Sequence, residues 1–193
     1  IYNTCVILDN GDVIGKYRKI HLFDVNIPGK ITYKESATYT AGDSVCILDT
    51  RYGKIGIGIC FDLRFPELSI LMAKEGAKLL IYPGNFTLTT GPMHWELLIR
   101  SRAVDNQVYV AACSLSKFPD PNVIQAYGHS MVVDPMGKVI EEAGEDPAVI
   151  VTDIDLDYLE ECRMQLPYQE MKRNDKMRGG EEQGRRQEEG GRK

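Results

Sequence analysis

Short runs of apolar and β-branched residues recur along the chain and predict a protein rich in strands. The first two runs, residues 2–8 and 13–19, are separated by "DNGD", whose Asn-Gly pair predicts a tight antiparallel hairpin. A second pair of runs, residues 44–50 and 54–60, flanks "RYG" and predicts another hairpin. The remaining predicted strands are residues 77–83, 108–114, 128–135, 137–142 and 148–154.

Three segments have the apolar spacing and the boundaries of helices, namely residues 65–77, 91–107 and 156–165. The first has Pro66 at its start and Gly76 near its end, and the third stops before Pro167. Helices that alternate with strands in this way indicate an α/β protein whose sheets are covered by helices on an outer face.

Composition adds the class of protein and excludes several kinds of partner. With 193 residues, 43% of them hydrophobic, and a net charge of −5, the chain is expected to be one soluble globular domain that binds neither nucleic acid nor an anionic membrane. No run approaches the roughly 18 apolar residues that span a bilayer. The five cysteines are odd in number and form no CxxC pair, so free thiols in a reducing compartment, the cytoplasm or else the mitochondrion, are expected.

The last sixteen positions, residues 178–193, contain only Arg, Lys, Glu, Gln and Gly. Such a segment has no side chain that could offset the entropy of ordering, so it is predicted to be a disordered tail. The predicted folded domain is therefore residues 1–177.

The stretch "GIGICFDLRF" at residues 56–65 raises the first chemical hypothesis. A strand runs into the start of a helix within a few residues, and Cys60 lies at the corner between them. Backbone N–H groups are free at such a corner to meet developing negative charge, so Cys60 is a candidate nucleophile. The alternative is an inert, buried thiol that behaves as a small hydrophobic residue.

Candidate partners for this thiol are Lys19, at the end of the second predicted strand, and Glu35, in a loop rich in hydroxyls. A lone lysine or glutamate is usually a solvated surface residue, which is the alternative for each. His21 could pair with Cys60, but a histidine at a strand end is more often structural, and spacing alone cannot pair the two. Since the histidines lie in no HExxH or CxxC context, neither a metal nor a cofactor is expected.

Several longer motifs occur together, in the order "KYRKIHLF", "GKIGIGICFDLRFPEL", "LLIYPGNF", "HWELLIRSRAVDNQVYV" and "YGHSMVVDPMGKVI". This combination closely resembles the nitrilase superfamily, the carbon-nitrogen hydrolases, over residues 1–177. Two further stretches, "HLFDVNIPGKITYKES" and "NFTLTTGPMHWELL", resemble the omega-amidases within it. The resemblance implies an α-β-β-α sandwich, a homodimer, and hydrolysis of the terminal amide of 2-oxo acids such as 2-oxoglutaramate and 2-oxosuccinamate.

The resemblance also implies roles for individual residues. Cys60 matches the family's nucleophile, Lys19 the lysine of its catalytic triad, and Glu35 a second glutamate that helps to orient the site. Lys19 and the backbone N–H of Phe61 would stabilise the oxyanion, and the reaction would pass through a thioester.

Substrate-binding roles are implied in the same way. Arg64 would pair with the carboxylate at the far end of the oxo acid, and Thr89 and Thr90 could donate hydrogen bonds to it. The alternative for Arg64 is an internal ion pair with Asp62 or Glu67.

One family residue has no counterpart in this chain. The triad's glutamate base lies well upstream of the lysine, whereas the residues before Lys19 include Asp9 and Asp12 but no glutamate. We therefore expect an N-terminally truncated amidase that lacks the sandwich's opening strands and helices. Two alternatives stay open: an amidase for deaminated glutathione, and a non-catalytic remnant that serves in binding or oligomerisation.

Overall fold

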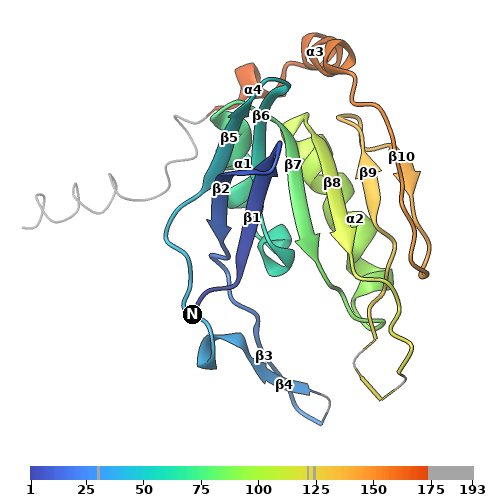
Figure 1. The fold of residues 1–193 in the computed structure, drawn as a ribbon. Coiled ribbons are helices and arrows are strands. Elements are labelled where there is room, and N and C mark those ends of the chain that lie inside the picture. Colours follow the sequence, from blue (N-terminus) through green and yellow to red (C-terminus); the bar gives the residue numbers. More distant parts are fainter. Residues whose placement is uncertain (30, 121, 124, 174–193) are drawn as a thin grey trace, which may run out of the picture.

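The computed structural model describes residues 1–29, 31–120, 122–123 and 125–173. Its centre is a six-stranded sheet with the order β10-β9-β8-β7-β6-β5 (Figure 1). The strands are β5 (Cys46–Thr50), β6 (Gly53–Ile57), β7 (Ala77–Gly84), β8 (Tyr109–Ser114), β9 (Met131–Val133) and β10 (Val139–Glu142). The predicted domain end at residue 177 and the predicted tail lie outside the described residues.

The middle of the sheet is parallel, because two helices make crossover connections there. β6, β7 and β8 run parallel, and the other neighbouring pairs run antiparallel. Helices α1 (Pro66–Lys74) and α2 (Gly91–Asn106) follow β6 and β7 and pack on the same face of the sheet. The carboxyl ends of β6 and β7 therefore meet at one edge, where α/β proteins commonly place their sites.

The main core lies between these helices and the sheet. Leu80 on the sheet, Met72 on α1 and Trp95 and Ile99 on α2 are each at most 1% exposed. This burial explains the helical spacing of apolar residues in the sequence, because each helix presents one apolar face to the strands.

The opposite face of β5 and β6 is covered by a hairpin of β1 (Thr4–Asp9) and β2 (Asp12–Arg18). Asn10 and Gly11 at its turn have φ values of 49° and 90°, which is the left-handed geometry that Asn-Gly supplies in tight hairpins. Tyr17 of β2 packs with Ile57 and Ile59 in a second buried cluster. The predicted first hairpin is confirmed, and it forms a second layer on the sheet.

Smaller elements complete the described chain. They are β3 (Asp24–Ile27), β4 (Ile31–Lys34), the 3-10 helices η1 (Glu35–Ala37) and η2 (Cys60–Arg64), α3 (Leu156–Gln165) and α4 (Tyr168–Met171). The β3–β4 hairpin and α4 were not predicted. Glu35, which was expected in a loop, instead begins η1 directly after β4. None of the helices in the described ranges is long and apolar enough to cross a membrane.

Two strand predictions need correction. The strand predicted for 54–60 ends at Ile57, since the chain turns into η2 at Cys60. The strand predicted for 148–154 is absent: the segment has no regular secondary structure, and Val149 and Val151 are 91% and 85% exposed. β-Branched residues favour a pleated surface, but a strand also needs a neighbour whose backbone it can pair with, and no described strand pairs with this segment.

Candidate active site

Cys60 lies at the carboxyl edge of β6 and β7, in a strained corner. Its φ is +49°, an uncommon value for a residue other than glycine and one that often marks functional sites. The half-buried Sγ donates to the carbonyl oxygen of Asn85, 3.4 Å away, just after β7. Gly84 makes this approach feasible, because a Cβ there would lie 2.9 Å from the Cα of Cys60.

Lys19 and Glu35 form a buried ion pair at the end of β2. Nζ of Lys19 lies 2.6 Å from Oε2 of Glu35, and the two side chains are only 3% and 5% exposed. Glu35 also accepts from the backbone N–H of Phe23 at 2.6 Å and from the side-chain amide of Asn3 at 3.0 Å. Burial alone would raise the pKa of Glu35, but the hydrogen bonds from these three donors outweigh it and lower the pKa.

Asp62 joins the end of β2 to the corner that carries Cys60. This carboxylate is fully buried, and Oδ2 accepts from the Tyr17 hydroxyl at 2.7 Å and the Ile59 N–H at 2.9 Å. Oδ1 accepts from the backbone N–H of His21 at 3.0 Å and contacts its Nδ1 at 2.7 Å. Burial and then the charge of Asp62 raise the pKa of Tyr17, so its hydroxyl stays protonated as a donor.

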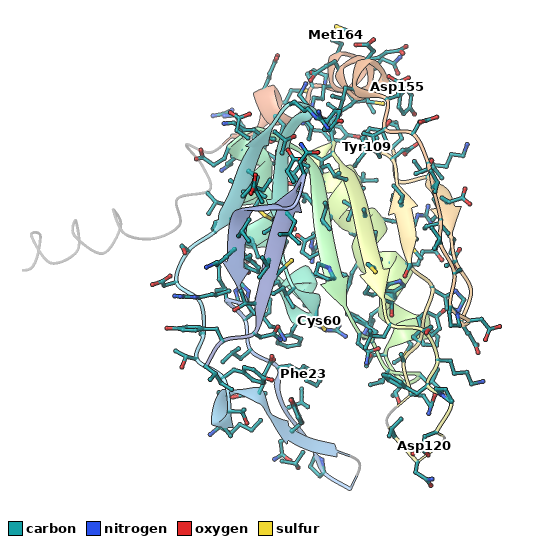
Figure 2. All side chains as sticks on the ribbon, viewed as in Figure 1. Phe23, Cys60, Tyr109, Asp120, Asp155 and Met164 are labelled. Atoms are coloured by element: carbon teal, nitrogen blue, oxygen red, sulfur yellow. The ribbon has the colours of Figure 1, made fainter. Side chains whose placement is uncertain are left out.

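Aromatic rings connect the segment after Lys19 with η2. The ring of Phe23 meets that of Phe61 edge-on, with centroids 5.0 Å apart, and His21 stacks on Phe65 at 3.7 Å. Figure 2 shows Phe23 and Cys60 toward the same end of the molecule. The structure therefore connects Lys19, Glu35 and Phe61 with Cys60 through packed side chains and hydrogen bonds.

Arg64 lies at the end of η2. It does not form the internal ion pair that the sequence left open as the alternative to a role in substrate binding. Within the described residues it pairs with neither Asp62 nor Glu67; instead, Nη1 lies 3.2 Å from Nδ1 of His94. Its guanidinium lies 4.7 Å from the centroid of the Phe86 ring. Burial lowers the pKa of Arg64, and its electrostatic interaction with Cys60 opposes that effect.

Thr89 and Thr90 follow β7 and precede α2, so they belong to the same edge of the sheet as Cys60. Thr89 is exposed and Thr90 is half-buried. Oγ1 of Thr90 lies 3.5 Å from Oγ1 of Thr87, and its carbonyl accepts from the N–H of His94 at 3.0 Å. Thr89 carries a hydroxyl on an exposed side chain, and a hydroxyl can donate to a ligand.

The sequence profile of the carbon-nitrogen hydrolases matches residues 1–164. The chain belongs to the carbon-nitrogen hydrolase family. It is 52% identical over 176 residues to the human protein named omega-amidase NIT2, an alignment that covers 91% of this chain and 63% of the human protein's length.

Solved structures place this carbon-nitrogen hydrolase in the nitrilase superfamily. Nit3 of Saccharomyces cerevisiae is similar with a TM-score of 0.78 and 47% identity, over 86% of this chain and 58% of that one. An amidase from Nesterenkonia sp. AN1, solved after Michael addition of acrylamide at its active site cysteine, is similar with a TM-score of 0.66 and 27% identity, over 86% and 62% of the two chains. The predicted α/β nitrilase fold is confirmed.

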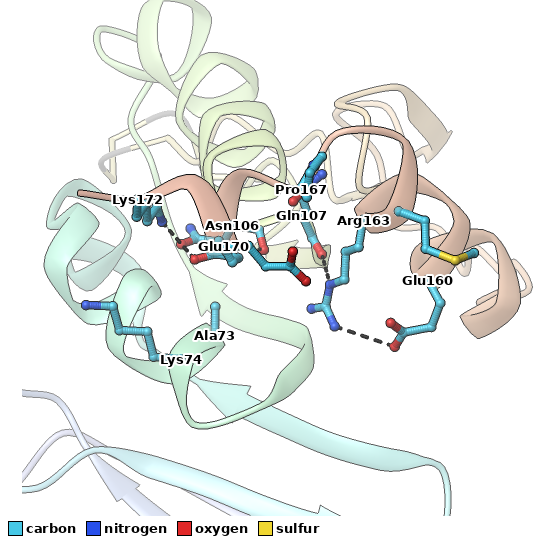
Figure 3. Close-up of a pocket in the computed structure, with 11 residues that line it drawn as sticks. Ala73, Lys74, Asn106, Gln107, Glu160, Arg163, Pro167, Glu170 and Lys172 are labelled. Carbon is cyan, nitrogen blue, oxygen red and sulfur yellow. Dashed lines mark hydrogen bonds and ion pairs between the residues drawn. The ribbon is translucent and has the colours of Figure 1, made fainter. Parts of the chain in front are cut away.

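A pocket of about 860 Å³ lies where α3 and α4 meet the ends of α1 and α2 (Figure 3), and Cys60 is not among its lining residues. Its walls include Lys74, Asn106, Gln107, Arg163 and Lys172, and its lining holds no thiol, hydroxyl or imidazole. No group of three metal-ligating side chains occurs within the described residues.

Sequence reasoning missed the roles of Tyr17, Asp62 and His94 at this site. Asp62 was considered only as an ion partner of Arg64, and His94 only among the histidines that could pair with a thiol or bind a metal. The contacts that define their roles join residues 45, 41 and 30 positions apart, and no local pattern encodes such pairs.

Proposed function

We propose that this carbon-nitrogen hydrolase is an omega-amidase, which hydrolyses the terminal amide of 2-oxoglutaramate, 2-oxosuccinamate and similar monoamides. The observation that carries the proposal is the strained, half-buried Cys60 beside the chain segment that carries a buried lysine-glutamate pair. Asp62 holds the two segments together, since it accepts from Tyr17 and His21 on either side of Lys19 and from Ile59 next to Cys60. The chain's 52% identity to the human protein named omega-amidase supports the choice of substrate class.

In the proposed mechanism the Sγ of Cys60 attacks the amide carbonyl. Lys19 and the N–H of Phe61, in the first turn of η2, stabilise the negative oxygen that forms. The C–N bond then breaks, ammonia leaves with an added proton, and the acyl group remains on sulfur as a thioester. Water attacks this thioester, and the product leaves as a carboxylate while the thiol is restored.

The proton of the thiol needs a base, and the residues before Lys19 supply no glutamate. Asp9 and Asp12 are exposed at the turn of the first hairpin, at the opposite end of β2 from Lys19. Neither can reach Cys60 from there. We therefore expect the 193-residue chain alone to be weakly active.

Arg64 is the proposed site for the substrate's carboxylate. It is half-buried, and within the described residues it is paired with no carboxylate. A guanidinium that is partly withdrawn from water and left without a counter-charge favours a bidentate carboxylate ligand. Thr89 and Thr90 would add hydrogen bonds from their hydroxyls.

The test is ammonia release from 2-oxoglutaramate, with deaminated glutathione as the competing substrate. We expect release by the chain fused to a relative's N-terminal segment that carries the glutamate, and loss of at least about 100-fold in Cys60→Ala. Cys113→Ala, which removes an exposed thiol, is the matched control and should keep full activity.

Activity that survives Cys60→Ala would refute the mechanism. Faster ammonia release from deaminated glutathione would refute the proposed substrate class. If the fused chain released no ammonia from either amide, the non-catalytic alternative would be favoured. Homodimer formation and a cytoplasmic location remain predictions.

A further inference from the structure

Arg64 is held in place by neutral groups alone. Among the described residues, its hydrogen-bond partner is Nδ1 of His94, at 3.2 Å. The rings of Phe86 and Phe61 lie 4.7 and 5.9 Å from its guanidinium carbon. Because an arginine has five N–H donors, this arrangement leaves most of them free for a ligand.

The contact determines the protonation of His94. A guanidinium only donates hydrogen bonds, so Nδ1 of His94 must accept, and the ring's proton lies on Nε2. The imidazole in this contact is therefore neutral. It orients the guanidinium without cancelling its charge, whereas a carboxylate at the same place would form an ion pair with Arg64 and compete with an anionic substrate.

The position of His94 is itself well defined. It lies in the first turn of α2, and its neighbour Trp95 is 1% exposed. Nε1 of Trp95 donates to the carbonyl oxygen of His129 at 2.6 Å, and its ring packs against Phe86 at 5.0 Å. The helix turn that carries His94 is thus anchored in the core, next to the ring on which Arg64 rests.

We propose that His94 determines the preference for anionic amides by positioning Arg64 while leaving its charge available. The inference rests on the proposed function, because it takes Arg64 as the site of the substrate's carboxylate. His94 acts through Arg64 and is a positioning residue.

The test measures binding without turnover, in the Cys60→Ala background, by titration calorimetry. One ligand is 2-oxoglutaramate, and the other is 4-oxopentanamide, in which a methyl group replaces the carboxylate. Three substitutions separate geometry from charge. His94→Asn keeps a neutral acceptor, because Oδ1 of Asn is as many bonds from Cα as Nδ1 of His. His94→Leu removes the acceptor, and His94→Asp replaces it with a charged one. Leu97→Ala, on the exposed side of α2, is the matched control.

We expect His94→Leu to raise the Kd of 2-oxoglutaramate about tenfold, since Arg64 is no longer positioned for its charge-assisted bond to the substrate's carboxylate. His94→Asp should raise it more, because the new carboxylate competes with the substrate for Arg64. The Kd of 4-oxopentanamide should stay within about threefold in every variant, and His94→Asn should restore most of the preference for the anion.

Equal weakening of both ligands, or an unchanged preference in His94→Asp, would overturn the inference. Arg64→Met separates it from the proposed function. If Arg64→Met leaves the preference for the anion intact, or if the parent shows no such preference, the assignment of the carboxylate site fails and the inference fails with it. If Arg64→Met abolishes the preference but His94→Leu does not, only the inference fails.

Discussion

Replacing Asp62 with Asn should destabilise the protein strongly, although the two side chains have nearly the same shape. The native carboxylate is fully buried and accepts from the Tyr17 hydroxyl, the Ile59 N–H and the His21 N–H, with a further contact to Nδ1 of His21. Each oxygen therefore faces one backbone donor and one side-chain group. An amide offers only one oxygen to these four positions.

The magnitude follows from the two orientations that the amide can take. If its nitrogen replaces Oδ2, the Tyr17 hydroxyl can rotate and accept, but the Ile59 N–H loses its acceptor. If it replaces Oδ1, the His21 ring can accept as the other tautomer, but the His21 N–H loses its acceptor. Either way one buried N–H is left unpaired, at about 1–3 kcal/mol, and two bonds that were made to a charge weaken by about 1 kcal/mol each.

We therefore expect Asp62→Asn to lower the free energy of unfolding by about 3–5 kcal/mol, a large part of the 5–15 kcal/mol usual for a domain. Urea unfolding followed by circular dichroism measures this quantity. Asp49→Asn, at an exposed position in β5, is the control and should change it by less than about 0.5 kcal/mol. A loss below about 1 kcal/mol in Asp62→Asn would refute the view that this network holds the end of β2 against the Cys60 corner.

Two further predictions concern the same site. The folded state lowers the pKa of Glu35 from its usual 4.5, so its ionised form stabilises the protein above that pH and this contribution is lost as the pH falls through the lower, folded value. The stability difference between the native protein and Glu35→Gln, measured by urea unfolding, should therefore be largest near neutral pH and shrink below about pH 4.5; a constant difference would contradict the role of its pairing with Lys19. Gly84→Ala should lower the free energy of unfolding by about 1–3 kcal/mol and reduce turnover in the fused enzyme, because the new Cβ would lie 2.9 Å from the backbone of Cys60. Gly144→Ala, where a Cβ meets nothing within 4 Å, should change neither, and equal effects at both glycines would refute the steric argument.

Local patterns in the sequence predicted most of the framework. The Asn-Gly turn, the apolar runs of the central strands and the spacing in α1 and α2 reflect interactions between residues close in the chain, so they could be read without a structure. The corner at Cys60 was also visible, because a strand pattern changes there into a helix pattern within a few residues. Lys19 and Glu35 were candidates by residue type alone, but only the family resemblance gave each a catalytic role, since a single lysine or glutamate is usually a surface charge.

The tertiary structure decided what these residues contact. It buried Lys19 and Glu35 together across 16 positions, placed Asp62 between Tyr17 and His21, and gave Arg64 a neutral partner in His94. It also left residues 148–154 without a pairing strand and formed the β3–β4 hairpin where no turn had been predicted. The physical reason is the same in each case. Periodicity reports which face of an element is apolar, but the partner of a buried polar group depends on how the elements pack, and that is determined only when distant segments of the chain come together.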